Sequence, residues 1–249
     1  MKLVFDRPKS MKDTVMHYCP GCSHGVVTRI VAEAIDILDI REKTVCVAPV
    51  GCAVFLYEYL NLDVTESPHG RPPAVATGIK RARPDLFVFT YQGDGDIAAI
   101  GLAEILSAAN RGENFSVVYV NNTVYGMTGG QMAPTTMLGQ RTTTTPYGKG
   151  AMDGRPLRMA EWIASLDGPS YVARMAVNTP SNVKKARKTV IEAFKMQLEG
   201  RGMSFVEILA ACPVGWGLSP IEALARVEKE LIPYYPLGVL KSVDSHKAG

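Results

Sequence analysis

The sequence predicts an α/β fold in which a mostly parallel sheet carries helices on both faces. Apolar runs of strand length alternate with stretches of helical periodicity along most of the chain. The run Leu86–Tyr91 has apolar residues on both faces of the expected strand. This is typical of a central strand covered by helices on both sides. The length of 249 residues, with 47% AVILMFWYC residues, suits one domain with a substantial core.

The first half of the chain contains three of the expected strands. Apolar residues at helical spacing lie between them, and Gly51, the 69–73 loop and Pro84 interrupt the pattern. The expected strands are Thr44–Val50, Leu86–Tyr91 and Phe115–Val120. The expected helices are His24–Leu38, Val54–Leu60, Ala74–Arg83 and Ile97–Asn110.

The second half opens with a long segment, 124–150, that is rich in Gly, Thr and Pro. A loop of this length inside a compact domain is usually functional, and we expect a bound cofactor to order it. The tail after Pro236 is expected to form a surface arm that clasps a partner subunit. The elements expected between the loop and the tail are the helices Pro156–Leu166 and Val183–Leu198 and the strands Tyr171–Val177 and Met203–Leu209.

The charge balance and the N-terminus exclude some classes of protein. Lys and Arg number 27 against 24 Asp and Glu, a surplus too small to indicate nucleic acid or an anionic membrane as partner. The first seven residues lack the apolar core of a signal peptide, and no stretch has the apolar length that spans a bilayer. We therefore expect a cytoplasmic protein.

Four of the five cysteines form a pattern that suits a metal centre. Cys19 and Cys22 stand at C-x-x-C spacing, while Cys52 and Cys212 each follow an expected strand; Cys46 lies inside a strand, where a buried thiol fits. A [4Fe-4S] cluster, a structural zinc and buried thiols without metal remain as alternatives. Structural zinc usually takes two close pairs of cysteines, whereas the third and fourth cysteines here are isolated, which favours iron.

Two further motifs follow neighbouring strands. Gly93-Asp94-Gly95-Asp96 comes after one expected strand and Asn121-Asn122 ends the next, so both should lie at the carboxyl edge of the sheet. Mg²⁺ prefers oxygen ligands, and Asp94, the amide of Asn122 and the main-chain carbonyl of Val124 supply them. Taken alone, Gly-Asp-Gly is more often only a turn.

The glycines of this turn suit the binding of a diphosphate. Gly95 permits close approach of the backbone to a phosphate at the start of a helix, where the dipole favours an anion. Asp96 is placed to accept a hydrogen bond from bound water.

These motifs together resemble a known family. Gly-Asp-Gly, a gap of 25 residues and Asn-Asn after an apolar strand is similar to the signature of thiamine diphosphate enzymes. Three segments resemble the β subunit of 2-oxoacid:ferredoxin oxidoreductases; they are Tyr18-Cys-Pro-Gly-Cys22, His69-Gly-Arg71 and Val124-Tyr-Gly-Met-Thr-Gly-Gly-Gln131. The resemblance extends from about Tyr18 to Trp216, and Thr142–Pro146 is similar to the branched-chain, 2-ketoisovalerate type.

The resemblance implies a thiamine diphosphate-binding fold with one diphosphate-binding domain, residues 1–249. That domain would include a cluster-binding segment, 17–24, and a C-terminal arm, 217–249. The aminopyrimidine-binding half would lie on an α-type partner subunit, so the activating glutamate belongs to the partner and no acid-base catalytic residue is expected here. Further γ and ferredoxin-like subunits are implied as well.

The resemblance also implies which residues contact the cofactor. His69 would bond a phosphate oxygen, although a lone histidine in such a loop is usually only solvated, and Arg71 would add charge or hold the loop. Thr128 would donate its hydroxyl to phosphate, while Tyr125 and Met127 would pack beneath the cofactor or touch substrate. The implied cofactor contacts are Gly51, His69, Gly70, Gly93, Gly95, Asp96, Gly126, Met127 and Thr128. The implied metal ligands are Cys19, Cys22, Cys52 and Cys212 for a [4Fe-4S] cluster and Asp94, Asn122 and Val124 for Mg²⁺.

The implied reaction is oxidative decarboxylation of a 2-oxoacid with coenzyme A to acyl-CoA and CO₂, with electrons leaving through the cluster to ferredoxin. The loop 126–130 has no cation for a second carboxylate, which favours a branched-chain 2-oxoacid over 2-oxoglutarate. Two alternatives remain. A non-redox thiamine diphosphate lyase or decarboxylase with structural zinc would contain no iron, and a non-catalytic electron-relay scaffold would not bind the cofactor.

Overall fold

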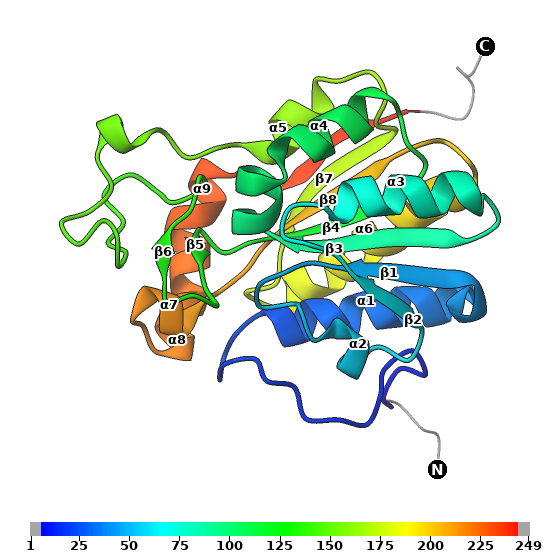
Figure 1. The fold of residues 1–249 in the computed structure, drawn as a ribbon. Coiled ribbons are helices and arrows are strands. Elements are labelled where there is room, and N and C mark those ends of the chain that lie inside the picture. The colour runs from blue at the N-terminus through cyan, green and yellow to red at the C-terminus, as the bar shows by residue number, and fades with distance from the viewer. Residues whose placement is uncertain (1–5, 244–249) are drawn as a thin grey trace.

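A computed structural model describes residues 6–243, and its centre is a seven-stranded sheet (Figure 1). The strand order is β2-β1-β3-β4-β8-β7-β9, and every pair is parallel except β7 with β9. The strands are β1 (Thr44–Ala48), β2 (Asp63–Glu66), β3 (Phe87–Gly93), β4 (Ser116–Asn121), β7 (Tyr171–Ala176), β8 (Ser204–Leu209) and β9 (Gly238–Ser242). The predicted mostly parallel sheet is confirmed.

Helices cover both faces of this sheet, as Figure 1 shows. The helices α1 (His24–Leu38) and α6 (Pro180–Leu198) pack on one face, and α3 (Pro72–Ala82), α4 (Leu102–Asn110) and α5 (Met159–Ala164) on the other. Successive side chains of a strand point to opposite faces, so Phe87 and Phe89 join the first core and Val88 joins the second. This explains why the central strands are apolar throughout.

The helix predicted for residues 97–110 is divided into two parts. A π-helical turn, η2 (Asp96–Ile100), precedes α4, and Gly101 lies at the junction. A Cβ at Gly101 would lie 2.7 Å from the carbonyl oxygen of Gly70, so only glycine permits this approach. The start of the helix is thereby packed against the 69–71 loop, which belongs to the functional site.

The part of the chain after Cys212 differs from the prediction. The helical segments α7 (Pro213–Trp216), α8 (Pro220–Arg226), η4 (Val227–Leu231) and α9 (Ile232–Tyr234) precede β9. The prediction of a surface arm after Pro236 is wrong for the described residues, because β9 pairs with β7 at the edge of the sheet. Residues 244–249 of the expected arm lie outside the described residues.

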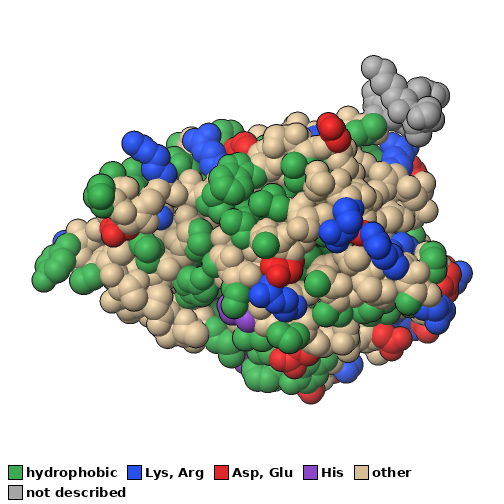
Figure 2. Space-filling model, turned by 45° about the horizontal axis from the view of Figure 1, so that its top comes forward, with side chains coloured by type: hydrophobic (Ala, Val, Ile, Leu, Met, Phe, Trp, Pro, Cys, Tyr) green, Lys and Arg blue, Asp and Glu red, His purple; other side chains and the backbone are tan. Residues whose placement is uncertain are grey.

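The remaining elements are short. They are η1 (Arg41–Lys43), α2 (Leu56–Tyr59), η3 (Ala151–Asp153) and a two-stranded antiparallel sheet of β5 (Val124–Tyr125) and β6 (Gln131–Met132). Within residues 6–243, no helix is both long and apolar enough to cross a membrane. Figure 2 shows acidic and basic side chains interspersed over one face, as expected from a formal net charge of +3.

Candidate functional site

A cleft opens at the carboxyl ends of β1, β3 and β4. From β1 the chain crosses to β2 on one side, while β3 lies on the other, and ligands of open α/β sheets bind where the strand order reverses in this way. Three segments line the cleft, namely residues 49–53 after β1, 93–96 after β3, and 122–128 after β4. His24 and His69 complete the lining.

Asp94 is the acidic centre of the cleft. Its side chain is buried, and its Oδ1 accepts a hydrogen bond from the Gly95 amide at 2.9 Å while its Oδ2 accepts one from the Thr135 hydroxyl at 2.6 Å. Burial raises the pKa of Asp94 to about 7, and the neutral donors that bond its carboxylate offset this rise only in part. A cation in the cleft would stabilise the ionised carboxylate.

The turn after β4 places the other two oxygen donors beside Asp94. The amide oxygen of Asn122 accepts a hydrogen bond from the Val124 amide at 3.3 Å, and both residues are buried and line the cleft. Between them, Thr123 has a φ of +62°, a left-handed conformation that is uncommon for a β-branched residue. The carboxylate, amide and main-chain oxygens are the hard ligands that Mg²⁺ prefers, so the residues present fit this ion.

Asp96 accepts three hydrogen bonds from the protein. Its Oδ1 accepts from Nδ1 of His69 and, at 2.7 Å, from the Gly70 amide, and its Oδ2 accepts from Gln92. Nε2 of His69 is the ring nitrogen left for a ligand. Gly70 does not line the cleft and instead secures Asp96, whereas every other predicted cofactor contact lines the cleft.

Thr128 and Met127 lie at the mouth of the cleft. The Thr128 hydroxyl donates to the side-chain oxygen of Gln131 at 2.5 Å, so it already has an acceptor within the protein. The Met127 side chain is 50% exposed. Tyr125 packs on Gly95, where a Cβ would lie 2.2 Å from the tyrosine ring, so only glycine permits this contact.

The four cysteines of the pattern converge beside this cleft. A Cβ at Gly126 would lie 3.3 Å from the sulfur of Cys52 and 3.4 Å from that of Cys212, so one cleft residue touches both thiols. The amide of Cys22 donates to the carbonyl of Cys19 at 3.0 Å, which closes the C-x-x-C turn. Cys46 stays apart, fully buried within β1.

The electrostatics of these thiols indicate that they lie near one another. Burial, with smaller contributions from Cys22, Cys19 and Asp94, raises the pKa of Cys52 to about 12. Burial likewise raises the pKa of Cys212 to about 12, with added contributions from Cys22, Cys52 and Asp94. Among the described residues that line the cleft, none is a lysine or arginine that would offset thiolate charge. A metal centre would supply that positive charge.

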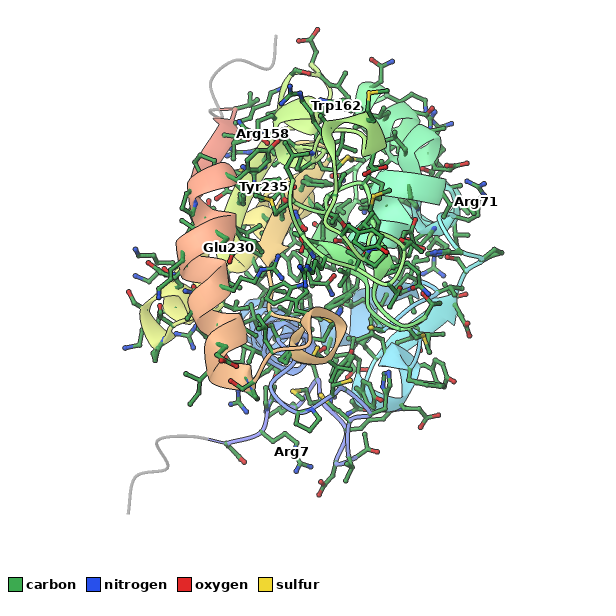
Figure 3. The ribbon with its side chains drawn as sticks, turned by 90° about the vertical axis from the view of Figure 1, so that its left-hand side faces the viewer. Arg7, Arg71, Arg158, Trp162, Glu230 and Tyr235 are labelled. Atoms are coloured by element: carbon green, nitrogen blue, oxygen red, sulfur yellow. The ribbon has the colours of Figure 1, made fainter. Side chains whose placement is uncertain are left out.

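The contacts of three further side chains complete the surroundings of the site. Arg71 forms an ion pair with Glu104 and does not line the cleft, so this contact fits the second of its two implied roles, that of holding the loop. Figure 3 shows Arg71 at the surface. Thr135, from the long loop, fixes Asp94, and the indole of Trp216 donates to the main-chain oxygen of Asn122 at 2.9 Å. The sequence gives one indication that Trp216 lies near the site, namely that it stands four residues after Cys212.

Comparison with protein families supports the assignment of the cleft as a thiamine diphosphate site. Residues 49–208 match the family model described as "Thiamine pyrophosphate enzyme, C-terminal TPP binding domain". The matched range includes the three segments that line the cleft.

Two individual proteins are similar to this chain over most of its length. The chain is 48% identical over 235 residues to ketoisovalerate oxidoreductase subunit VorA of Methanothermobacter thermautotrophicus, which covers 94% of this chain and 49% of that protein. The chain thus spans about half the length of this relative. It is 38% identical over 212 residues to 2-oxoglutarate synthase subunit KorB of Archaeoglobus fulgidus, with 85% and 75% of the two chains covered.

A solved structure shares the fold. It is the 2-oxoglutarate:ferredoxin oxidoreductase from Magnetococcus marinus with 2-oxoglutarate, coenzyme A and succinyl-CoA bound. The TM-score is 0.78 at 28% identity, and the match covers 98% of this chain and 87% of the other.

Proposed function

The chain belongs to the thiamine diphosphate-binding subunits of the 2-oxoacid:ferredoxin oxidoreductases, and from this premise we propose that it forms the diphosphate-binding half of such an enzyme. The reaction converts a 2-oxoacid anion and the thiol of coenzyme A into acyl-CoA, CO₂, one proton and two electrons. Electrons leave through a [4Fe-4S] cluster on this chain to ferredoxin. The aminopyrimidine-binding half, with the activating glutamate, belongs to an α-type subunit, and γ and ferredoxin-like subunits complete the assembly.

One observation carries this proposal, namely that the position of Gly126 borders both sets of metal ligands. Its position lies next to the sulfurs of Cys52 and Cys212, while its own segment also carries Asn122 and Val124. Oxygen donors for a hard cation and thiols for a soft one therefore share a single cleft wall. A non-redox enzyme has no use for thiols at this position, and an electron-relay scaffold has no use for the oxygen donors.

The chain's own residues hold the groups in place. Bound thiamine diphosphate supplies the electron sink for decarboxylation, and the cluster accepts electrons one at a time. Asp94, Asn122 and Val124 bind the Mg²⁺ that offsets the diphosphate charge. His69, fixed by Asp96 through Nδ1, presents Nε2 toward the cleft, where it donates to a phosphate oxygen. Val50 and Met127 give the lining of the cleft an apolar part.

The thiol arrangement favours a cluster over a single zinc ion. Among residues 6–243, no three His, Cys, Asp or Glu side chains are placed to hold one metal ion. Thiolates around a cluster stand farther apart than those around one ion, because iron and sulfide atoms fill the space between them. The four cysteines lie near one another, but among the described residues no three are placed to bind a single ion. This spacing suits a cluster.

The cleft favours a 2-oxoacid with an apolar side chain, such as 2-ketoisovalerate. Val50 and Met127, which are 39% and 50% exposed, lie on its lining, and the described lining residues include no cation for a second carboxylate. The similarity to a ketoisovalerate oxidoreductase subunit agrees with this choice. The 2-oxoglutarate synthase relatives make 2-oxoglutarate the second candidate.

The test is anaerobic purification of the chain with its co-expressed partner subunits, followed by metal analysis and assay with ferredoxin. We expect iron without zinc, and coenzyme A-dependent reduction of ferredoxin that is faster with 2-ketoisovalerate than with 2-oxoglutarate. Zinc in place of iron, or decarboxylation without ferredoxin reduction, would establish the non-redox alternative. Faster turnover of 2-oxoglutarate would overturn only the substrate assignment.

A further inference from the structure

The side chain of Trp216 connects the thiol set to the Mg²⁺ turn. Trp216 ends α7, which begins directly after Cys212, and its main-chain amide donates to the Cys212 carbonyl at 3.0 Å. Its indole Nε1 donates to the main-chain oxygen of Asn122 at 2.9 Å. A residue of the thiol segment thus bonds the backbone of a residue whose side chain is a candidate Mg²⁺ ligand.

The turn that Trp216 bonds is strained. Thr123 has a φ of +62°, and a β-branched residue keeps such a conformation only where its surroundings hold it. The Thr123 carbonyl accepts from the Thr136 hydroxyl at 2.6 Å, and the indole holds the carbonyl of the preceding peptide. We expect that loss of the indole bond would let this peptide rotate and move the side chain of Asn122 and the carbonyl of Val124.

Contacts on its other sides fix the indole itself. The guanidinium of Arg226 lies 4.6 Å from the ring centroid of Trp216, and Arg226 pairs with Glu230 at 2.9 Å on the helical segment seen from its side in Figure 3. At Gly215 a Cβ would lie 2.7 Å from the Cys212 sulfur and 3.1 Å from Val124. The short helix α7 is therefore packed between the thiols and the Mg²⁺ turn.

We infer that Trp216 is a positioning residue that couples the binding of the iron-sulfur cluster to the binding of Mg²⁺ and thiamine diphosphate. A cluster bound to Cys212 fixes α7, and the indole then holds the 122–124 turn in the conformation that binds Mg²⁺. The inference rests on the proposed function, since it requires both groups. Because such coupling is reciprocal, each group strengthens binding of the other by the same factor.

The test compares the dissociation constant of Mg²⁺-thiamine diphosphate, measured by calorimetry on the chain assembled with its α-type partner, before and after anaerobic reconstitution of the chain with iron and sulfide. In the wild type the cluster should tighten binding about 10-fold, a typical coupling between two sites. Trp216→Phe keeps the ring but removes the donor, so the effect of the cluster should fall to about 2-fold or less. Trp162→Phe, which changes the chain's other tryptophan on α5, should keep the full effect.

A second variant tests the strain directly. Glycine adopts a positive φ freely, so in Thr123→Gly the turn no longer needs the indole. The Thr123 hydroxyl has no hydrogen-bond partner in the structure, and its removal breaks no bond. Thr123→Gly should restore tight binding to Trp216→Phe and, as a single change, should reduce the effect of the cluster even if Trp216→Phe does not fold.

Two results would overturn the inference while the proposed function stands. The first is a Trp216→Phe protein that binds both groups and keeps the full 10-fold effect expected of coupled sites. The second is a wild-type chain in which the cluster leaves cofactor binding unchanged. A wild-type chain that takes up no iron, or that binds no thiamine diphosphate when assembled with its α-type partner, would overturn the proposed function itself.

Discussion

Two buried carboxyl groups, on Asp94 and Glu207, show how the site differs from the rest of the interior. Burial raises the pKa of both groups. Glu207 on β8 has its counter-charge in the protein, because Arg174 on β7 donates to it at 2.9 Å and Asn121 donates at 2.8 Å. The donors to Asp94, the Gly95 amide and the Thr135 hydroxyl among them, are neutral. The protein therefore neutralises one of its buried acids and leaves the other for a ligand cation.

The surroundings of Arg174 strengthen this contrast. The guanidinium is fully buried, also pairs with Glu161, and lies 5.2 Å from the ring centroid of Tyr235. In Figure 3, Tyr235 lies between the helix that carries Glu230 and the sheet. The same contrast separates Cys46, alone in the core, from the four thiols beside the cleft. Burial favours the neutral forms of Asp94 and of the four thiols beside the cleft. A metal bound there would favour their ionised forms.

The largest effect on stability is expected from Arg174→Met. This change leaves Glu207 buried without its cation, and removal of one partner from a buried pair costs about 3–5 kcal/mol. Chemical denaturation should show the loss, and Glu207→Gln in the same protein should recover part of it. A loss below about 1 kcal/mol, the range of exposed pairs, would mean that Arg174 does not stabilise the fold as a buried pair.

Asp94→Asn should act in the opposite direction on stability. Without ligand, the neutral amide removes a buried charge that has no cation, so the variant should gain about 1 kcal/mol at pH 8, a rise in Tm of about 2–4 °C. Binding of Mg²⁺-thiamine diphosphate should weaken about 100-fold or more, because a direct metal ligand is lost. Calorimetry measures both effects. Lower stability together with unchanged binding would show that Asp94 is not a ligand of Mg²⁺.

The pH dependence follows from the raised pKa of Asp94. A carboxyl whose pKa rises on folding contributes stability below its unfolded value of 3.8, and that contribution is lost as pH rises through about 7. Mg²⁺ requires the ionised form, so binding should weaken about 10-fold for each pH unit below 7 and level off above it. Asp94→Asn should flatten both profiles, and a wild-type profile that is already flat would contradict the assignment.

A smaller effect is expected from Gly126→Ala. The added methyl would lie 3.3–3.4 Å from two cysteine sulfurs, a tight contact, so reconstituted iron should fall or the spectrum of the cluster should change. Gly78→Ala is the matched control, because its Cβ meets nothing within 4 Å on the helix α3. That change should stabilise the fold by up to about 1 kcal/mol and leave the iron content unchanged. Equal iron content in both variants would show that Gly126 does not border the metal centre.

Periodicity predicted the central elements from the sequence. The helix His24–Leu38 was predicted with the bounds that α1 has in the structure, and the five predicted strands all lie in the sheet. These segments succeed because their apolar residues repeat with the period of the structure that buries them. The site motifs were found because their residues follow strand ends, where a parallel sheet places ligands.

Features that depend on tertiary contacts were missed. The edge strands β2 and β9 have few buried residues, so no apolar alternation marks them. The contacts of Asp96 with His69, Gly70 and Gln92 were not predicted, and the first two residues come from another segment of the chain. Thr135 and Trp216 reach the Mg²⁺ residues across the fold, and nothing local in the sequence indicates that contact.

The central claim is that Cys19, Cys22, Cys52 and Cys212 hold one cluster beside the diphosphate site. The direct measurement is the iron and acid-labile sulfide content of the anaerobically reconstituted chain and of its single Cys→Ser variants. The account predicts about four iron and four sulfide atoms per chain in the wild type and in Cys46→Ser, and none retained in Cys52→Ser. A full cluster in Cys52→Ser, or its loss in Cys46→Ser, would contradict the account.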